Sequence, residues 1–596
     1  MNENLLRLAD LKKRDRLLGL GKVALGILAV ALLLLALQAH HGYRWVVLDA
    51  VVFAVLAVVH ERVLKKVAET QAIAALYERG LARLEDRWAG SGEGGERFAS
   101  EGHAYARDLD LFGAGSLFER LCVVRTRAGE ETLARWLQEA ASPEEIGARQ
   151  EAVRDLRERL EFRERLFTAG NRVRLGVRPD KLVEWGERES GAVRLKAAPW
   201  LAALLAALWV ASLVYGFAAN EWRALLLLSA VNLSVDAYLR KRVKADPEAI
   251  EEAASDLDLL AEVLRILESE RFNSEKLRGL QFALKTGGVA PSAAVKRLDQ
   301  IAEYLEHAEN LMVRVVDRFV FYTVQWTLRA EAWRGEYGRA IRGWLAAVGE
   351  MEALAALSGY AFERPEDAWP EVREGAAQFE AEAMAHPLLP ESAAVRNDLT
   401  LGEGLQLIVL SGPNMSGKST FIRGIGVNAV LAQTGAPVRA KRLRMSPLSI
   451  GASICVLDSL QGGVSRFYAE IKRLKVIRDK AQGKPAVLFL LDELLSGTNS
   501  HDRLEGTRMV VRALVEHGAI GLVTTHDLAL ARIPESLGER ARNYHFEDRV
   551  EAGKLIFDFK LKEGVVETSN ALKLMESIGL LPEGDARSGA DRVRSR

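Results

Sequence analysis

The chain of 596 residues is poor in cysteine and carries no excess of charge of either sign. Its two cysteines, Cys122 and Cys455, are far apart and lack metal-ligand spacing, which excludes a disulfide framework or a zinc site and favours a reducing compartment. Lys and Arg number 81, as do Asp and Glu, so the overall charge does not indicate a general nucleic-acid binder. The length predicts about three to four domains.

Four apolar stretches predict membrane-spanning helices. Residues 23–43 and 197–220 contain no Lys, Arg, Asp or Glu, and each is followed by a second apolar run, Trp45–Val59 or Ala224–Val235. These lengths suit two transmembrane hairpins. Basic residues flank both pairs: Lys12, Lys13, Arg14, Arg16, Lys22, Arg62, Lys65, Lys66, Arg240, Lys241, Arg242 and Lys244. Because positive charge stays on the cytoplasmic side, we expect a multi-pass cell-membrane protein with most of its chain in the cytoplasm.

Each hairpin has an alternative interpretation. The first segment could be a cleaved signal peptide, but no small-residue cleavage site is evident and a second apolar run follows at once, which favours a retained anchor. The second pair could be buried helices of a soluble domain, because its last segment is short and ends near Asp236. Asp49 in the second segment either lies near the interface or pairs inside a bundle.

The segment Gly412–Thr420 reads Gly-Pro-Asn-Met-Ser-Gly-Lys-Ser-Thr and fits the phosphate-loop pattern G-x-x-x-x-G-K-[ST]. It stands between a predicted buried strand, 405–410, and a predicted helix from Phe421. Backbone N–H groups and a helix N-terminus would therefore meet at one point and bind ATP. The predicted nucleotide-binding residues are Gly412, Pro413, Asn414, Met415, Ser416, Gly417, Lys418, Ser419 and Thr420, with Lys418 on the β- and γ-phosphates and Ser419 on Mg²⁺. The alternative is a glycine-rich turn without a ligand.

Two further predicted strands end in polar residues. Ala486–Glu493 ends in two acids, which suits Asp492 as a support for Mg²⁺ and Glu493 as the group that polarises the attacking water. The alternative is a helix N-cap. Ile520–Thr525 delivers His526 at its end, where open α/β sheets place ligand contacts. We expect His526 to sense the γ-phosphate through the water, and the alternative is a structural histidine.

These segments resemble the MutS family of DNA mismatch repair proteins, whose ATPase domain is of the ABC type. Pro413, Asn414 and Met415 match the variant of the phosphate-loop motif found in that family. Asp458–Glu470 resembles the family's signature segment, in which a serine matched here by Ser465 reaches the γ-phosphate across a dimer interface. Ser496–Asp502 and Thr524–His526 are similar to the interface segment and the histidine switch. The resemblance implies ATP, Mg²⁺ and a homodimer, with Ser465 acting in trans.

The resemblance weakens upstream. Ser116–Leu137 and Arg149–Val153 look like the start of the MutS helical core, and His386–Leu389 looks like the beginning of the ATPase domain. Nothing before residue 108 resembles the mismatch-reading domain. The second hairpin interrupts the core where family members insert a DNA clamp, and Ser416 stands where the repair proteins usually have Gly, a change that should spare phosphate binding by the backbone.

The expected fold is a C-terminal α/β P-loop ATPase domain of the ABC type, preceded by an all-α lever domain with two transmembrane helical hairpins. The expected order is a hairpin at 1–68, a linker at 69–107, helical core at 108–196, a hairpin at 197–240, helical core at 241–375, the ATPase domain at 376–582 and a disordered tail at 583–596.

Two functions fit this organisation. One is a membrane-anchored ATPase that couples hydrolysis to DNA binding, which the family resemblance and the basic cluster Lys441–Arg444 favour, although that cluster also suits a solvated surface. The other is an ATP-driven switch that acts on the membrane or a protein partner without DNA, which the missing reader and clamp favour. A transporter is less well supported, because Asp49, Asn232 and Ser234 are the main polar positions in the apolar segments.

Overall fold

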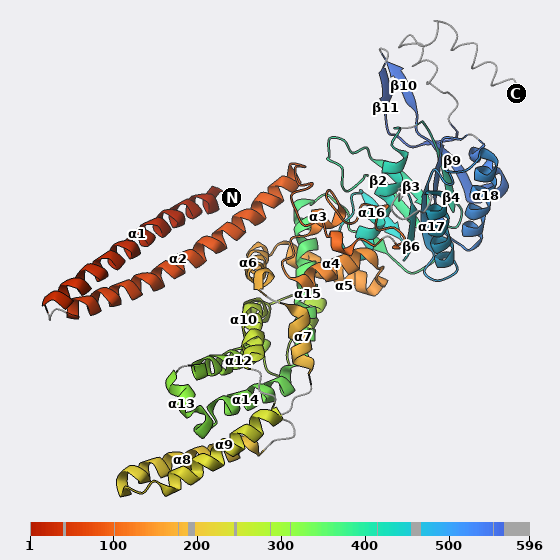
Figure 1. Cartoon of the computed structure of the whole chain (residues 1–596). Helices are drawn as coiled ribbons and strands as arrows, with labels where there is room; N and C mark the ends of the chain where they lie inside the picture. Colours follow the sequence, from red (N-terminus) through yellow and green to blue (C-terminus); the bar gives the residue numbers. More distant parts are fainter. Residues whose placement is uncertain are drawn as a thin grey trace, which may run out of the picture.

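Two long helices lead into the body of the protein in the computed structural model (Figure 1). α1 (Asn2–Ala39) and α2 (Tyr43–Leu84) lie side by side as a hairpin, and the His60 ring meets the Asp15 carboxylate at 2.7 Å between them. The outer apolar side chains are exposed, as for Ile27 at 67%. The structure describes residues 2–39, 43–100, 102–176, 178–188, 197–243, 247–286, 288–309, 311–413, 415–454, 466–527, 529–551 and 554–565.

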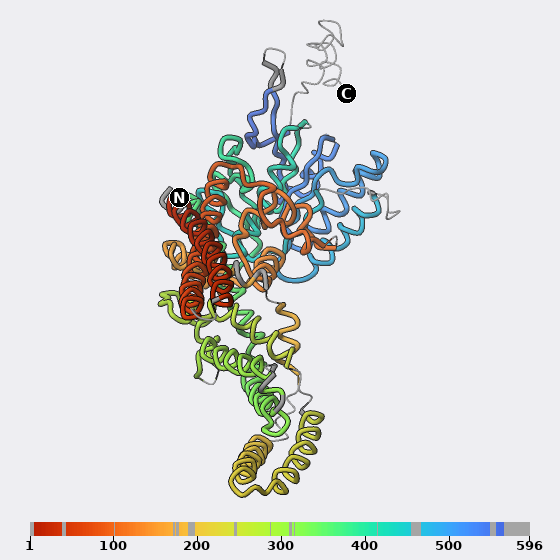
Figure 2. Tube along the Cα trace, turned by 60° about the vertical axis from the view of Figure 1, so that its left-hand side comes forward, coloured from red at the N-terminus to blue at the C-terminus, as the bar shows by residue number. Residues whose placement is uncertain are grey.

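A second hairpin, α8 (Ala198–Ala219) and α9 (Arg223–Val243), lies at the end of the molecule far from the C-terminal domain (Figures 1 and 2). Within the described part of the chain, two helices are long and apolar enough to cross a membrane by length and composition, Leu5–Gln38 and Ala198–Ala219. The other two predicted crossings lie in α2 and α9. Both hairpins reach toward the left-hand side of Figure 1, which comes forward in Figure 2.

The body between the hairpins and the C-terminal domain is helical. Its elements are η1 (Glu96–Phe98), α3 (Leu117–Leu121), α4 (Arg127–Gln138), α5 (Pro143–Arg157), α6 (Leu160–Gly176), α7 (Pro179–Glu187), α10 (Pro247–Ser269), α11 (Glu275–Ala283), α12 (Pro291–Glu306), η3 (His307–Glu309), α13 (Leu311–Val320), α14 (Tyr322–Tyr337) and α15 (Ala340–Glu363). α15 is buried along most of its length against α4 and α5. At Gly349 an added Cβ would lie 2.6 Å from the carbonyl oxygen of Ala128, so the close approach of α15 to α4 requires glycine.

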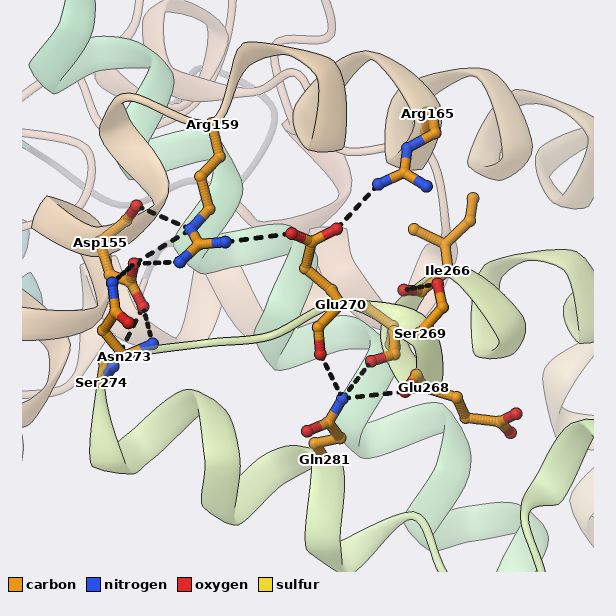
Figure 3. Close-up of polar contacts among 11 residues, drawn as sticks. Asp155, Arg159, Arg165, Ile266, Glu268, Ser269, Glu270, Asn273, Ser274 and Gln281 are labelled. Carbon is orange, nitrogen blue, oxygen red and sulfur yellow. Dashed lines mark hydrogen bonds and ion pairs between the residues drawn. The ribbon is translucent and has the colours of Figure 1, made fainter.

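Polar contacts brace the two halves of this helical body (Figure 3). The Asp155 carboxylate at the end of α5 accepts the backbone N–H groups of Asn273 at 2.7 Å and Ser274 at 3.0 Å, just before α11. Glu270 pairs with Arg159 at 3.0 Å, and the Gln281 amide donates to carbonyl oxygens at the end of α10. Helix ends that would lack partners are thereby satisfied across the insertion of α8 and α9.

The C-terminal domain contains a six-stranded sheet in the order β12-β9-β4-β8-β7-β6, with β12 antiparallel to β9 and the other pairs parallel. A four-stranded sheet, β1-β5-β2-β3, and the hairpin β10-β11 complete it. The elements are β1 (Glu371–Val372), β2 (Phe379–Met384), β3 (Asn397–Leu401), β4 (Leu407–Ser411), α16 (Lys418–Thr434), β5 (Arg442–Met445), β6 (Ser449–Ser453), α17 (Arg466–Ala481), β7 (Val487–Asp492), α18 (Ser500–Glu516), β8 (Ile520–Thr525), η4 (Leu530–Arg532), α19 (Ile533–Leu537), η5 (Gly538–Arg540), β9 (Ala541–His545), β10 (Asp548–Glu551), β11 (Lys554–Phe557) and β12 (Lys562–Glu563).

The central strands are continuous apolar runs, and β4 is buried at each position because strands flank it on both sides and helices cover its faces. Their carboxyl ends meet at one edge of the sheet. α16 begins there, directly after the loop that follows β4. This edge holds the predicted phosphate loop, the acidic pair and His526.

The structure departs from the expected organisation at two boundaries. Residues 69–84, expected to belong to a linker, continue α2, and residues 85–107 pack on the body, with Trp88 and Tyr105 buried. The C-terminal domain begins earlier than residue 376, because β1 pairs with β5. The reason is tertiary: a Gly-rich, polar stretch is held by packing and by backbone contacts that composition does not reveal. The tail at 583–596 lies outside the described residues.

Candidate active site

The loop after β4 contains residues with positive φ, a backbone conformation that glycine adopts readily. Gly412 and Gly417 have φ of 151° and 90°, and Met415 also has a positive φ, 68°. A Cβ on Gly417 would lie 2.9 Å from the Phe559 ring, so bulk is excluded there as well as strain. The buried Ser416 hydroxyl has no hydrogen-bond partner among the described residues. Asn414 lies outside them.

Lys418, the first residue of α16, reaches back over this loop. Its side chain is 5% exposed, and its Nζ atom donates to the carbonyl oxygens of Gly412 at 2.8 Å and Pro413 at 2.9 Å. Burial lowers the pKa of the Lys418 ammonium, while the Glu493 and Asp492 carboxylates act in the opposite direction. The ammonium is therefore held at the mouth of the loop, and Ser419 and Thr420 follow it in the first turn of α16.

The acidic pair lies at the end of β7, beside the end of β8. Thr524 of β8 stands opposite Asp492 in the sheet and donates its hydroxyl hydrogen to the Asp492 carboxylate. The same hydroxyl oxygen accepts the backbone N–H of Glu493 at 3.1 Å. Glu493 has a φ of 46°, which turns its side chain away from the strand direction. One threonine thus positions both acids.

Glu493 lies between two basic groups. Its Oε1 atom is 3.1 Å from Nδ1 of His526 and 4.0 Å from Nζ of Lys418. His526 is half-exposed, and the next residue, Asp527, pairs with Arg503 of α18 at 2.8 Å. The pKa of Asp527 is lowered mainly by a hydrogen bond from the backbone N–H of Ala529 and, to a smaller extent, by the contact with Arg503. The structure thus brings together Lys418 at the start of α16, Glu493 after β7 and His526 after β8. The sequence predicted that these residues lie at the same edge of the sheet.

The residue types around Asp492 fit a magnesium ion. Mg²⁺ in phosphate-loop enzymes binds one or two protein oxygens together with substrate phosphates rather than a cage of side chains. The Asp492 carboxylate and the Ser419 hydroxyl are oxygen ligands of this kind. No cluster of three or more His, Cys, Asp or Glu side chains able to hold a metal occurs in the described part of the chain.

A cavity of about 200 Å³ adjoins the phosphate loop and was not predicted. Its walls include His386, Phe421, Phe546 and Phe559, which come from four separate segments. Burial, with help from nearby Arg423, lowers the pKa of His386 to about 4, so its ring is neutral at physiological pH. No local pattern marks the two aromatic residues after β9, and only the fold brings them to the loop.

Asp108 is a second residue that sequence reasoning missed. It lies before α3, far from the motifs, yet its Oδ1 atom accepts the backbone N–H of Ile454 at 2.7 Å and its Oδ2 atom accepts from Arg473 at 2.9 Å. Ile454 and Arg473 lie on either side of residues 455–465. That segment, with the predicted Ser465, is outside the described residues.

The segment after the acidic pair, residues 494–502, is anchored by hydrogen bonds to α17 and at the start of α18. The backbone N–H of Leu495 donates to Glu470 of α17 at 2.7 Å, and Asn499 caps α18 by accepting the N–H of Asp502 at 2.9 Å. The apolar side chain of Met415 in the phosphate loop is 86% exposed.

Comparison with known proteins agrees with this geometry. Residues 408–587 match the family MutS domain V. This MutS domain is a P-loop ATPase fold, and the match covers the phosphate loop, the acidic pair, Thr524 and His526. The helical body and both hairpins precede the matched residues. The C-terminal part of the chain is thus similar to MutS domain V.

Similar proteins found by sequence comparison are also named as MutS proteins. The chain is 30% identical over 258 residues to the DNA mismatch repair protein MutS of Chloroflexus aurantiacus, covering 42% of this chain and 26% of the relative. It is 35% identical over 207 residues to the DNA mismatch repair protein MutS of Natronomonas pharaonis (33% and 23%), and 30% identical over 216 residues to the endonuclease MutS2 of Thermus thermophilus (35% and 28%). The chain therefore spans about a quarter of the length of these relatives.

Proposed function

We propose that this protein is a membrane-anchored ATPase that hydrolyses ATP at the edge of its MutS-type ATPase domain. The observation that carries the proposal is the Glu493 carboxylate, held 3.1 Å from His526 and 4.0 Å from Lys418 at the mouth of a phosphate loop. A carboxylate so placed can accept a proton from, or orient, a water molecule in line with a bound γ-phosphate. His526 orients Glu493 and the water.

Phosphate binding follows from the loop itself. The backbone N–H groups of Met415, Ser416, Gly417 and Lys418 lie at the N-terminus of α16, where the helix dipole favours anions. Lys418 would exchange its two carbonyl contacts for phosphate oxygens. Because those contacts are hydrogen bonds to neutral carbonyls, an ionic contact can replace them.

Ser419 and Asp492 would hold Mg²⁺, which supplies positive charge to the phosphate oxygens. Thr524 keeps the Asp492 carboxylate in place through its hydroxyl group. The neutral His386 and the aromatic walls of the adjoining cavity suit the flat face of a nucleobase. These assignments use the predicted nucleotide-binding residues apart from Asn414 and Ser465, which lie outside the described residues.

A homodimer would complete the site. Met415, whose apolar side chain is exposed at the phosphate loop, is available for contact with a second copy of the chain. Ser465 of the partner subunit would then reach the γ-phosphate, as its place in the signature segment suggests. ATP binding would close the pair and hydrolysis would release it.

Anchoring in the cell membrane is supported by the two apolar helices, α1 and α8, and by the common direction in which both hairpins extend (Figure 1). The basic residues at the bases of the hairpins favour a cytoplasmic ATPase domain. Lipid is thus a proposed partner along with a second copy of the chain.

DNA is the proposed partner of the ATPase cycle, on the strength of the relatives named as mismatch repair proteins. The basic cluster Lys441–Arg444 adds little, because Arg442 and Arg444 both pair with Glu371 at 3.8 and 3.4 Å. The second candidate function is therefore an ATP switch that moves the membrane hairpins or a protein partner without DNA.

A specific set of contacts favours this second candidate. Arg83 of α2 pairs with Glu363 at the end of α15, and the next residue, Arg364, lies 3.6 Å from Asp86 and 3.9 Å from Glu391. Glu391 in turn pairs with the buried Arg439, whose backbone N–H donates to Asn428 of α16 at 2.9 Å. The first hairpin is thus tied by side chains to the helix that begins at the phosphate loop.

The test is ATP turnover by the full chain in lipid nanodiscs, with and without homoduplex, mismatched and branched DNA. Glu493→Gln is the inactive variant and Glu505→Gln, on the exposed side of α18, is the matched control. Turnover that Glu493→Gln abolishes supports the ATPase, and its stimulation by any DNA supports DNA coupling. ATP turnover that no DNA changes, together with no DNA binding at low salt, would exclude DNA as a partner. The ATP switch would then be the supported function. Turnover unaffected by Glu493→Gln would contradict the assigned site.

A further inference from the structure

The short helix α13 lies beside the second hairpin and carries basic side chains that nothing in the ATPase explains. Arg314 and Arg318 are exposed and four residues apart, hence on one side of the helix. Lys241 and Arg242, at the base of α9, are also exposed. None of these four makes an ion pair with a described residue. They form a cationic group at the foot of the hairpin.

α13 is fixed to the hairpin by specific contacts. The Asn232 amide of α9 donates to the carbonyl oxygen of Phe319 at 2.7 Å, and the Phe319 ring stacks on Trp209 of α8 with centroids 5.1 Å apart. Arg240 of α9 pairs with Asp317 of α13 at 2.7 Å. The cationic side of α13 therefore has a set position relative to the apolar helices.

The hairpin beyond these contacts is apolar and exposed. On α8, Val214 is 63%, Tyr215 55% and Phe217 76% exposed. From Trp209, which contacts α13, to Ala219 the helix is about 15 Å long, about half the thickness of a bilayer core. The polar contact of Arg240 with Asp317 lies at the opposite end from the turn at Asn220.

An apolar groove opens between α8 and the corner of α13 and α14. It has a volume of about 590 Å³, and small residues of α8, such as Ala207 and Ala211, face Val320, Tyr322 and Trp326 across it. The Trp326 ring also stacks on Tyr304 at 4.1 Å, with the Arg329 guanidinium 4.1 Å above it. Aromatic rings next to cationic groups are typical of the headgroup level of a membrane.

We propose that α13 lies in the headgroup layer of an anionic bilayer, with Arg314 and Arg318 on lipid phosphates and with α8 and α9 inserted beside it. The corner of Tyr322 and Trp326 lies at the boundary with the acyl chains, one of which occupies the groove. This inference rests on the proposed membrane anchoring and adds the lipid class and the surface that contacts it. Cationic residues near an anionic surface are attracted to it, and the attraction is screened by salt.

The test uses variants of the full chain that carry Cys455→Ser and one introduced cysteine, with the buried Cys122 left in place. Each variant is labelled with the fluorophore NBD at the introduced cysteine and placed in nanodiscs with or without phosphatidylglycerol. Val316→Cys reports on α13, Val214→Cys on α8, Ile27→Cys on α1, and Arg508→Cys on the exposed side of α18. Quenching by iodide measures access from water. ATP turnover of each labelled protein confirms that it is folded.

We expect quenching at Val316→Cys to be several-fold weaker than at Arg508→Cys in anionic nanodiscs. The double variant Arg314→Glu and Arg318→Glu should raise quenching of the Val316→Cys label to the level seen for Arg508→Cys. The control double variant Arg508→Glu and Arg512→Glu should leave quenching of the Val316→Cys label unchanged.

Strong quenching at Val316→Cys with weak quenching at Val214→Cys and Ile27→Cys would overturn this inference and leave the anchoring intact. Strong quenching at all three would overturn the anchoring itself. Weak quenching at Val316→Cys that the charge reversal and phosphatidylglycerol leave unchanged would overturn the contact with anionic phosphates.

Discussion

The Oε1 atom of Glu493 lies 3.1 Å from the Nδ1 atom of His526, although the two residues follow different strands of the sheet. Lys418 approaches the same carboxylate at 4.0 Å from the first turn of α16. A carboxylate between an imidazole and an ammonium is restrained in position, which is what orientation of a water molecule demands.

His526→Ala should lower ATP turnover by about 100-fold, the lower range for loss of a positioned proton-transfer partner. The affinity for nucleotide should change little, because the histidine does not contact the phosphate loop. Turnover and binding of a fluorescent ATP analogue measure the two effects. His517→Ala, at the exposed end of α18, is the control, and equal losses in both variants would contradict the assignment.

Thr524→Val should raise the Mg²⁺ concentration needed for half-maximal turnover and lower the maximal rate, by about 10- to 100-fold together. The valine has nearly the same shape but cannot donate to Asp492 or accept the backbone N–H of Glu493. A magnesium titration of ATP turnover tests this, with Thr400→Val on the exposed side of β3 as the control. An unchanged titration would show that Thr524 does not position the acids.

Asp108→Ala should lower turnover by about tenfold or more while nucleotide binding persists, because the carboxylate fixes both flanks of residues 455–465. Asp108→Asn retains an acceptor for the N–H of Ile454 and should recover part of the rate. The neighbouring Asp110→Ala, which loses an exposed pair with Arg423, is the control. Loss of nucleotide binding in step with turnover would indicate a merely structural role.

The ion pair of Arg83 with Glu363 should be worth more than a surface pair, since the two side chains are 9% and 13% exposed. Removal of one partner leaves a largely buried charge, and Arg83→Ala should cost about 3 kcal/mol. Thermal unfolding in detergent for Arg83→Ala, Glu363→Ala and the double variant gives the coupling. The exposed pair Arg512 and Glu516 should give less than about 1 kcal/mol.

Glu352 should make stability fall as pH rises toward neutrality. Burial raises the pKa of its carboxyl group to about 7, against hydrogen bonds from the Thr126 hydroxyl, the Thr126 N–H and the Arg125 N–H. The folded chain therefore holds this proton where the unfolded chain has lost it. The stabilisation is complete below about pH 4.5 and is lost as pH rises through about 7, a change of about 3 kcal/mol.

The measurement is the thermal midpoint between pH 5 and pH 8. Glu352→Gln should flatten this dependence, whereas Glu350→Gln on the same helix should preserve it. A dependence that Glu352→Gln leaves unchanged would assign the proton to another group.

The sequence by itself determined the chemistry of the candidate site. A phosphate loop, an acidic pair and a histidine each follow an apolar run, and parallel strands bring their carboxyl ends to one edge of a sheet. That rule is local, since each motif needs only its own strand, and Lys418, Glu493 and His526 lie together as expected. The long apolar helices α1 and α8 were also predictable, because length and composition suffice to find them.

Only the tertiary structure decided which distant residues support that site. Asp108, Phe546 and Phe559 carry no motif, and they reach the site because the chain before α3 and the chain after β9 pack against it. The supposed linker at 69–107 likewise became part of α2 and of the packed body. Such contacts depend on long-range packing, which the order of residues along one segment does not encode.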